Sequence, residues 1–155
     1  MKKNFILTLF ISVLLGLQSL IAGETATREE CIQKVQEVVA YIKEKGIDAS
    51  FDTLMDKDGP FVWKDSYVFV ITMTGTVVAH PVIPTLNGGD FSGLIDQNGK
   101  MFVNEYLAIA RGEGQGWVDY VWTKPGVEGK VFPKDSFVMK VPGMDYIAIA
   151  GYYLE

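Results

Sequence analysis

The chain has 155 residues, of which 14 are basic and 19 acidic, and its formal net charge at pH 7 is -5. This acidic balance argues against nucleic acid or an anionic membrane surface as the main partner. A single cysteine excludes an internal disulfide, and one histidine with one cysteine is too few for a zinc site. No Cys-x-x-Cys-His motif for covalent haem is present, so we expect no cofactor and no metal.

The first residues are typical of a secretory signal peptide. Lys2 and Lys3 precede an apolar run from Phe5 to Leu15, and the small residues Ala22 and Gly23 offer a cleavage site. The strongly apolar part is shorter than a bilayer span requires. We therefore expect residues 1–23 to be removed and residues 24–155 to form one periplasmic or secreted domain without a membrane span. A retained N-terminal anchor is the alternative.

A long amphipathic helix is predicted over Thr27–Lys45. Thr27 and Glu30 have the spacing of a capping box, and the helix ends in basic residues followed by Gly46. Its apolar residues recur at helical spacing: Cys31, Ile32, Val35, Val38, Val39 and Ile42. Cys31 is expected to be a buried hydrophobic residue, because the sequence supplies no nearby base to activate it as a nucleophile.

The rest of the chain is predicted to be rich in β-structure. Runs of β-branched and aromatic residues indicate a hairpin from Tyr67–Ile71 and Thr76–His80, then a Trp-rich strand that starts at Gly116 and precedes a turn at Pro125-Gly126, and later strands over Ser136–Val141 and Tyr146–Tyr153. A short helix is expected over Phe102–Ala110. This order predicts an α+β fold in which helices pack on an antiparallel sheet.

Two tryptophans and a tyrosine lie within six residues of one another in the Trp-rich stretch Gly116–Pro125. Strand alternation places Tyr120 and Trp122 on one face and Trp117 on the other. Such side chains suit the walls of a small ligand pocket, because each joins a large apolar body to one polar group. The alternative is that these rings only fill the core.

Several motifs in a fixed order resemble the single Cache domain, a PAS-like extracellular sensor module of bacterial chemoreceptors and kinases. The motifs are Trp63, Asp65-Ser66-Tyr67-Val68-Phe69-Val70, Ala79-His80-Pro81, Asp96-Gln97-Asn98-Gly99-Lys100, Gly116-Trp117-Val118-Asp119-Tyr120-Val121-Trp122, Lys134, Val141-Pro142-Gly143-Met144-Asp145 and Gly151-Tyr152-Tyr153. The resemblance implies a five- to six-stranded antiparallel sheet behind a long N-terminal helix, with a pocket for a small organic acid. Because the sequence ends directly after the last expected strand, we expect a free-standing, exported form without an output module.

Eight residues are the candidate ligand contacts. His80 can donate a hydrogen bond to a carboxylate, and Lys124 or Lys134 can neutralise one. The remaining candidates form aromatic walls: Trp63, Tyr67, Trp117, Tyr120 and Trp122. Lys134 is preferred over Lys124 because it matches the family's lysine before the next strand. The alternatives are a core histidine and two solvated surface lysines.

Two turns begin like calcium loops, but Tyr67 and Leu107 occupy the position that a bidentate glutamate would need. Arg111 ends the expected helix and is read as a partner of its dipole. We expect a binding module and not an enzyme, recognising a carboxylate of the acetate, propionate, pyruvate or lactate class with a membrane signalling or transport partner. The alternative is an interaction subunit with a vestigial pocket that docks on a receptor.

Overall fold

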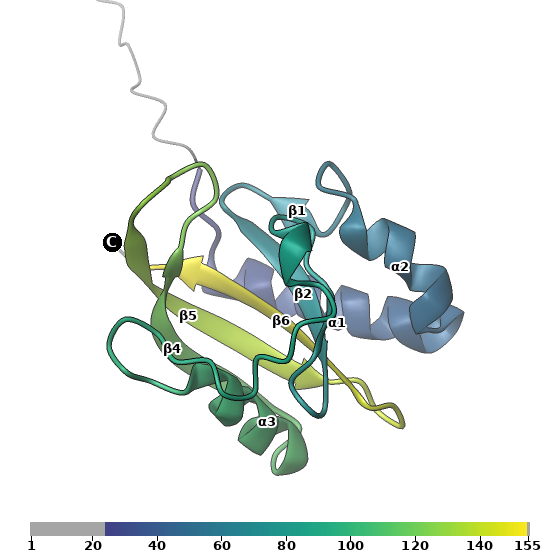
Figure 1. Cartoon of the computed structure of the whole chain (residues 1–155). Helices are drawn as coiled ribbons and strands as arrows, with labels where there is room; N and C mark the ends of the chain where they lie inside the picture. Colours follow the sequence, from purple (N-terminus) through teal and green to yellow (C-terminus); the bar gives the residue numbers. More distant parts are fainter. Residues whose placement is uncertain (1–23, 155) are drawn as a thin grey trace, which may run out of the picture.

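The computed structural model describes residues 24–154, so the predicted signal peptide lies outside the described residues. The domain is α+β and contains an antiparallel sheet with helices on both faces (Figure 1). Its elements are α1 (Arg28–Lys45), α2 (Ile47–Met55), β1 (Val62–Trp63), β2 (Ser66–Thr72), β3 (Val77–Ala79), the short 3-10 helix η1 (Pro84–Leu86), α3 (Phe102–Arg111), β4 (Gln115–Thr123), β5 (Val131–Lys140) and β6 (Tyr146–Tyr153). Between residues 24 and 154, no helix has the length and hydrophobicity to cross a membrane.

Helix α1 begins as the sequence predicts. The Glu30 amide donates to the Thr27 hydroxyl at 3.2 Å, and the Thr27 amide donates to the Glu30 carboxylate at 2.9 Å. The helix ends at Gly46, whose φ of +79° is unfavourable for residues with a side chain. The sequence analysis did not predict α2, which starts directly after this glycine.

The sheet order is β1-β2-β6-β5-β4. Strands β1 and β3 both pair with the same edge of β2, β1 near the start of that strand and β3 near its end. All pairings are antiparallel. In register, Tyr120 of β4 lies opposite Lys134 of β5, which lies opposite Tyr153 of β6. These three residues therefore form one row across the sheet.

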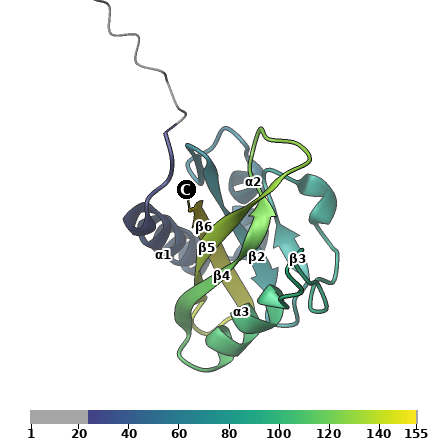
Figure 2. The same ribbon diagram turned by 90° about the vertical axis from the view of Figure 1, so that its left-hand side faces the viewer.

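Helices α1 and α3 cover opposite faces of the sheet (Figure 2). The α1 face is closed by aliphatic residues of the helix, and the α3 face carries a concentration of aromatic side chains. The sequence placed the start of β5 at Ser136, but the strand begins at Val131. As a consequence, Lys134 lies within the strand and not in the loop before it.

Candidate ligand-binding site

A cavity of about 30 Å³ lies on the α3 face of the sheet, closed by α3 and by the connection between β3 and α3. It is lined by Tyr67, Phe69, Ile71, Val77, His80, Leu86, Phe91, Leu94, Phe102, Val103, Tyr106, Tyr120 and Trp122. The lining is mostly apolar, with a few polar atoms from His80 and the tyrosines. This is the composition of a small-molecule site, although the volume has room for little more than a water molecule.

Aromatic contacts fix the walls of this cavity. The rings of Phe102 and Tyr120 are stacked, with centroids 4.3 Å apart and an interplanar angle of 4°. Trp122 packs edge-on against Phe102 at 5.7 Å, and Tyr67 packs against His80 at 4.7 Å. Four of the eight candidate residues thus line the cavity: Tyr67, His80, Tyr120 and Trp122.

Two hydrogen bonds hold His80 in one orientation, one to its ring and one from its backbone amide. The Ile83 amide donates to His80 Nδ1 at 3.0 Å, and the His80 amide donates to the Asn87 side chain at 2.9 Å. Burial, and to a smaller extent the charge of Lys134, lowers the pKa of His80 to about 3. The ring is therefore neutral at physiological pH, and because Nδ1 accepts, the proton is on Nε2, which is a donor.

Lys134 is the most unusual side chain of the domain, because it is a lysine with only 1% of its surface exposed. Its ammonium lies 3.5 Å from the Tyr67 hydroxyl and 4.5 and 4.9 Å from the ring centroids of Tyr67 and Tyr153. Gly151 on β6 leaves the space for it: a Cβ at this position would lie 2.8 Å from Lys134 Cε.

The charge of Lys134 lacks a matching anion. No carboxylate within residues 24–154 forms an ion pair with it. Burial accordingly lowers the pKa of Lys134 to about 7, and the nearby Cys31 thiol and Asp65 carboxylate oppose that shift only in part. Lys134 is not itself a lining residue of this cavity; its ammonium lies against the ring of Tyr67, which is one.

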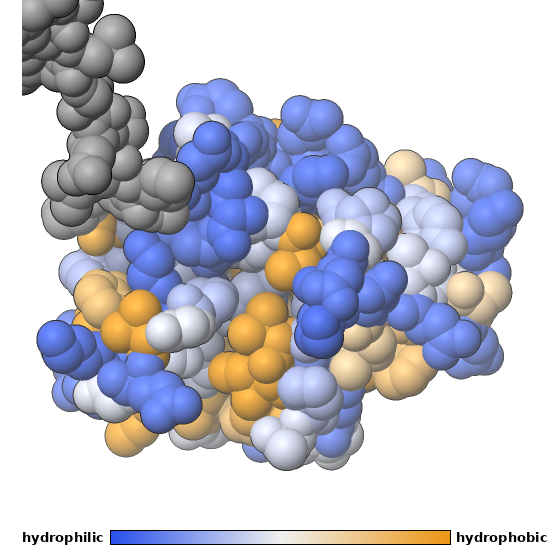
Figure 3. All heavy atoms as spheres, turned by 90° about the horizontal axis from the view of Figure 1, so that it is seen from above, coloured by the Kyte–Doolittle hydropathy of each residue, from blue (hydrophilic) through white to orange (hydrophobic). Residues whose placement is uncertain are grey.

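Lys124, the second candidate cation, lies outside the cavity. It borders an open cleft of about 440 Å³ between the β4–β5 connection and residues 82–83, and Tyr67 lines both the cleft and the cavity. Lys124 Nζ is 2.9 Å from the Asp65 carboxylate, so its charge is already paired. Figure 3 shows the end of the molecule that carries the β4–β5 connection, where hydrophobic side chains lie among hydrophilic ones.

The structure does not bring Trp63 and Trp117 to the cavity. Both pack against the core on the α1 face. Trp117 stacks under the Arg28 guanidinium at 3.8 Å and contacts Phe137 at 5.2 Å. The reason is strand alternation, which points Trp117 away from Tyr120 and Trp122. The expectation that these two tryptophans form walls of the same pocket is therefore corrected.

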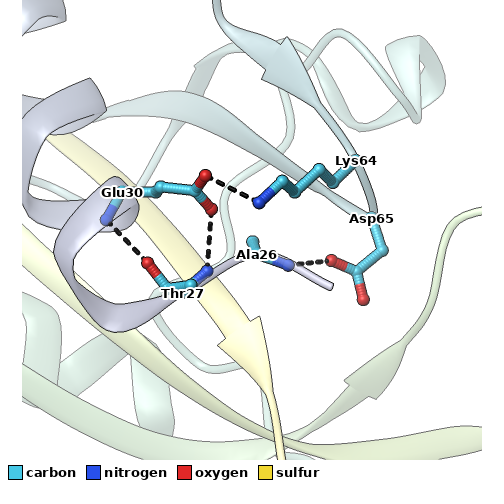
Figure 4. A network of polar contacts seen from close by, with 5 residues as sticks. All are labelled: Ala26, Thr27, Glu30, Lys64 and Asp65. Carbon is cyan, nitrogen blue, oxygen red and sulfur yellow. Dashed lines mark hydrogen bonds and ion pairs between the residues drawn. The ribbon is translucent and has the colours of Figure 1, made fainter. Parts of the chain in front are cut away.

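Asp65 joins the start of α1 to the strand that carries Tyr67. Its carboxylate accepts a hydrogen bond from the Ala26 amide at 2.7 Å, in a buried position (Figure 4). The same carboxylate also pairs with Lys124. Beside it, Lys64 pairs with Glu30 at 2.7 Å in a more exposed position. The point where the chain enters the domain is thus fixed to the turn before β2.

Replacing Asp65 by alanine should lower the free energy of unfolding by about 2 kcal/mol, because the buried Ala26 amide would lose a charged acceptor. Urea denaturation measures this. Lys64→Ala is the control, since it removes only the exposed ion pair and should cost less than about 1 kcal/mol. Equal losses in the two variants would show that Asp65 does not anchor the segment.

Sequence reasoning missed several cavity residues. Tyr106 and Phe102 lie one turn apart on α3, so the apolar face of the predicted helix was an available signal. Leu86, Phe91 and Leu94 come from a connection without regular periodicity, and no pattern in the sequence indicated that it folds over the sheet.

A sheet with a long N-terminal helix on one face and a small aromatic cavity on the other is the architecture of PAS-like sensor domains. The family model for single Cache domain 2 matches residues 6–155. The chain therefore belongs to the single Cache domain 2 family, as its motifs indicated.

Two curated relatives are signalling proteins. The methyl-accepting chemotaxis protein McpP of Pseudomonas putida is 27% identical over 99% of this chain, and the sensor histidine kinase MctS of Rhizobium johnstonii is 32% identical over 59% of it. The chain spans only 25% and 20% of the lengths of these proteins. It is thus homologous to the sensor domains of a chemoreceptor and of a histidine kinase.

Solved structures of sensor domains have the same fold. A periplasmic sensor domain of a chemotaxis protein is 28% identical, with a TM-score of 0.66 over 82% of this chain and 90% of the other. A methyl-accepting chemotaxis protein from Vibrio parahaemolyticus gives a TM-score of 0.69 at 22% identity, over 82% of this chain and 88% of the other. A Cache chemosensory domain described for its carboxylic acid recognition gives 0.66 at 24% identity, over 84% of this chain and all of the other.

Proposed function

We propose that this domain, exported after removal of residues 1–23, is a sensor for small monocarboxylates. The observation that carries the proposal is Lys134, a buried cation without an anionic partner in the described chain, next to an aromatic cavity. A carboxylate that reached this ammonium would supply the missing countercharge. One structural neighbour of the same fold recognises carboxylic acids, which is consistent with this class of ligand.

The site supports one carboxylate and not two. Lys134 is the only cation near the cavity within residues 24–154, since Lys124 is paired with Asp65 in the adjacent cleft. A second carboxylate of a dicarboxylic acid would be buried without a partner, which is strongly unfavourable. The neutral His80 adds a donor at Nε2 but no charge.

Binding requires the cavity to expand. Its volume of about 30 Å³ is too small for an acid of two to four carbons, so we propose that the half-buried side chains of Leu86, Phe91 and Leu94 move outward when the ligand enters. The same small volume also supports a second candidate function, an interaction subunit with a vestigial pocket. In either case we propose a membrane receptor or kinase as the partner.

A thermal-shift screen of short mono- and dicarboxylates distinguishes the two candidates. Monocarboxylates of two to four carbons should raise the melting temperature, because a ligand that binds only the folded state stabilises it by mass action. The matching dicarboxylates should have no effect at the same concentration. If no acid moves the melting temperature, the interaction subunit is the better proposal.

A further inference from the structure

The hydroxyl of Tyr106 is buried and has no hydrogen-bond partner within residues 24–154. Tyr106 is fully inaccessible to solvent and lines the cavity from α3. A buried hydroxyl without a partner is costly, and natural structures rarely retain one unless a ligand or water satisfies it. Burial also raises the pKa of Tyr106 well above its usual value, so the group stays protonated and can donate.

The neighbouring hydroxyls also have spare donors. Tyr120 and Ser136 form one hydrogen bond with each other, at 3.0 Å. A hydroxyl carries one donor, so whichever of the two donates, the other keeps an O–H without an acceptor in the described chain. Tyr67 accepts the long contact from Lys134, so its own O–H remains a donor.

Donors therefore surround the cavity, and side-chain acceptors are scarce. Among the lining residues the donors are His80 Nε2 and the tyrosine hydroxyls; Lys134 Nζ and Ser136 are not lining residues but contact two of those tyrosines, Tyr67 and Tyr120. The lining contains no aspartate, glutamate, asparagine or glutamine. A ligand that matches this set has several acceptor oxygens close together and few donors of its own.

We propose that the Tyr106 hydroxyl recognises the oxygen of a 2-oxo group, so that the site prefers 2-oxo monocarboxylates over unsubstituted acids of the same length. This inference rests on the proposed function and specifies its ligand class. A 2-oxo acid presents three acceptor oxygens and no donor in its ionised form. A 2-hydroxy acid also presents a third oxygen, but its O–H needs an acceptor, and the lining has few. Its affinity should therefore lie between those of the 2-oxo acid and the unsubstituted acid.

Isothermal titration calorimetry of the purified protein with pyruvate, L-lactate and propionate tests this ranking. We expect pyruvate to bind roughly tenfold more tightly than propionate, with L-lactate between them, which is the range of one net hydrogen bond. In Tyr106→Phe the preference for pyruvate over propionate should fall to less than about threefold, while propionate affinity stays within about twofold of the unmodified protein. Tyr152→Phe is the control, because its hydroxyl bonds to Asp135 on the opposite side of the sheet, and it should keep the full preference.

The stability of Tyr106→Phe without ligand provides a second measurement. Removing a hydroxyl that has no partner should leave the melting temperature unchanged or raise it. A marked decrease would mean that the hydroxyl has a structural partner, and would overturn the inference. Equal affinities for pyruvate and propionate, or an unchanged preference in Tyr106→Phe, would overturn it as well while leaving monocarboxylate sensing in place. Failure of all three acids to bind would instead remove the proposed function itself.

Discussion

Replacing Lys134 by methionine is expected to weaken propionate binding by about 30- to 1000-fold. This corresponds to about 2–4 kcal/mol, the usual cost of removing one member of a buried ion pair. Methionine fills a similar volume without a charge, so the bound carboxylate would be buried alone. Isothermal titration calorimetry measures the loss.

Two other lysines provide matched controls. Lys130→Met changes an exposed residue of the β4–β5 connection and should leave affinity unchanged. Lys124→Met removes a cation that Asp65 already neutralises, and the loss should stay below about fivefold. The ligand-free Lys134→Met protein should be at least as stable as the unmodified one, because a buried charge without a partner has been removed. Binding by Lys134→Met within threefold of normal would exclude Lys134 as the counter-ion.

The α1 face and the succession of the main strands along the chain could be predicted from the sequence. The capping box at Thr27 and the helical spacing of Val35, Val38 and Ile42 depend only on local geometry and on one buried stripe. The last strand, Tyr146–Tyr153, was predicted with its observed limits. Helix α2 was missed because its nine residues follow Gly46 without a side-chain cap.

The candidate site was predictable only where strand alternation applied. Tyr120 and Trp122 share the cavity face, and the same rule sends Trp117 to the other face. Burial of Lys134 depends on a residue far along the chain, since Gly151 on the neighbouring strand leaves the space that its side chain occupies. The sequence favoured Lys134 over Lys124 only through the family resemblance, and the physical reason, the ion pair of Lys124 with Asp65, required the structure.

The structure also changes which residue should control the pH dependence of binding. An unperturbed imidazole titrates near neutral pH, so His80 would be the first residue to consider. With its pKa lowered to about 3 by burial, His80 is neutral at pH 5 and above and cannot contribute a charge there. Lys134, with a pKa lowered to about 7, becomes the group that titrates in this range.

Propionate affinity should therefore fall by about 100-fold between pH 6 and pH 9. The carboxylate is ionised throughout this range, and it binds the charged form of Lys134, whose population in the free protein falls about tenfold per pH unit above 7. The bound anion favours the ammonium and raises the Lys134 pKa, so above pH 7 each binding event takes up close to one proton. Calorimetry at pH 8 in buffers of different ionisation enthalpy measures that uptake directly, and Lys134→Met, whatever affinity it retains, should show none. An affinity that fell between pH 5 and pH 7 and then levelled off would assign the titration to His80 instead, and would mean that its ring is charged when the ligand binds.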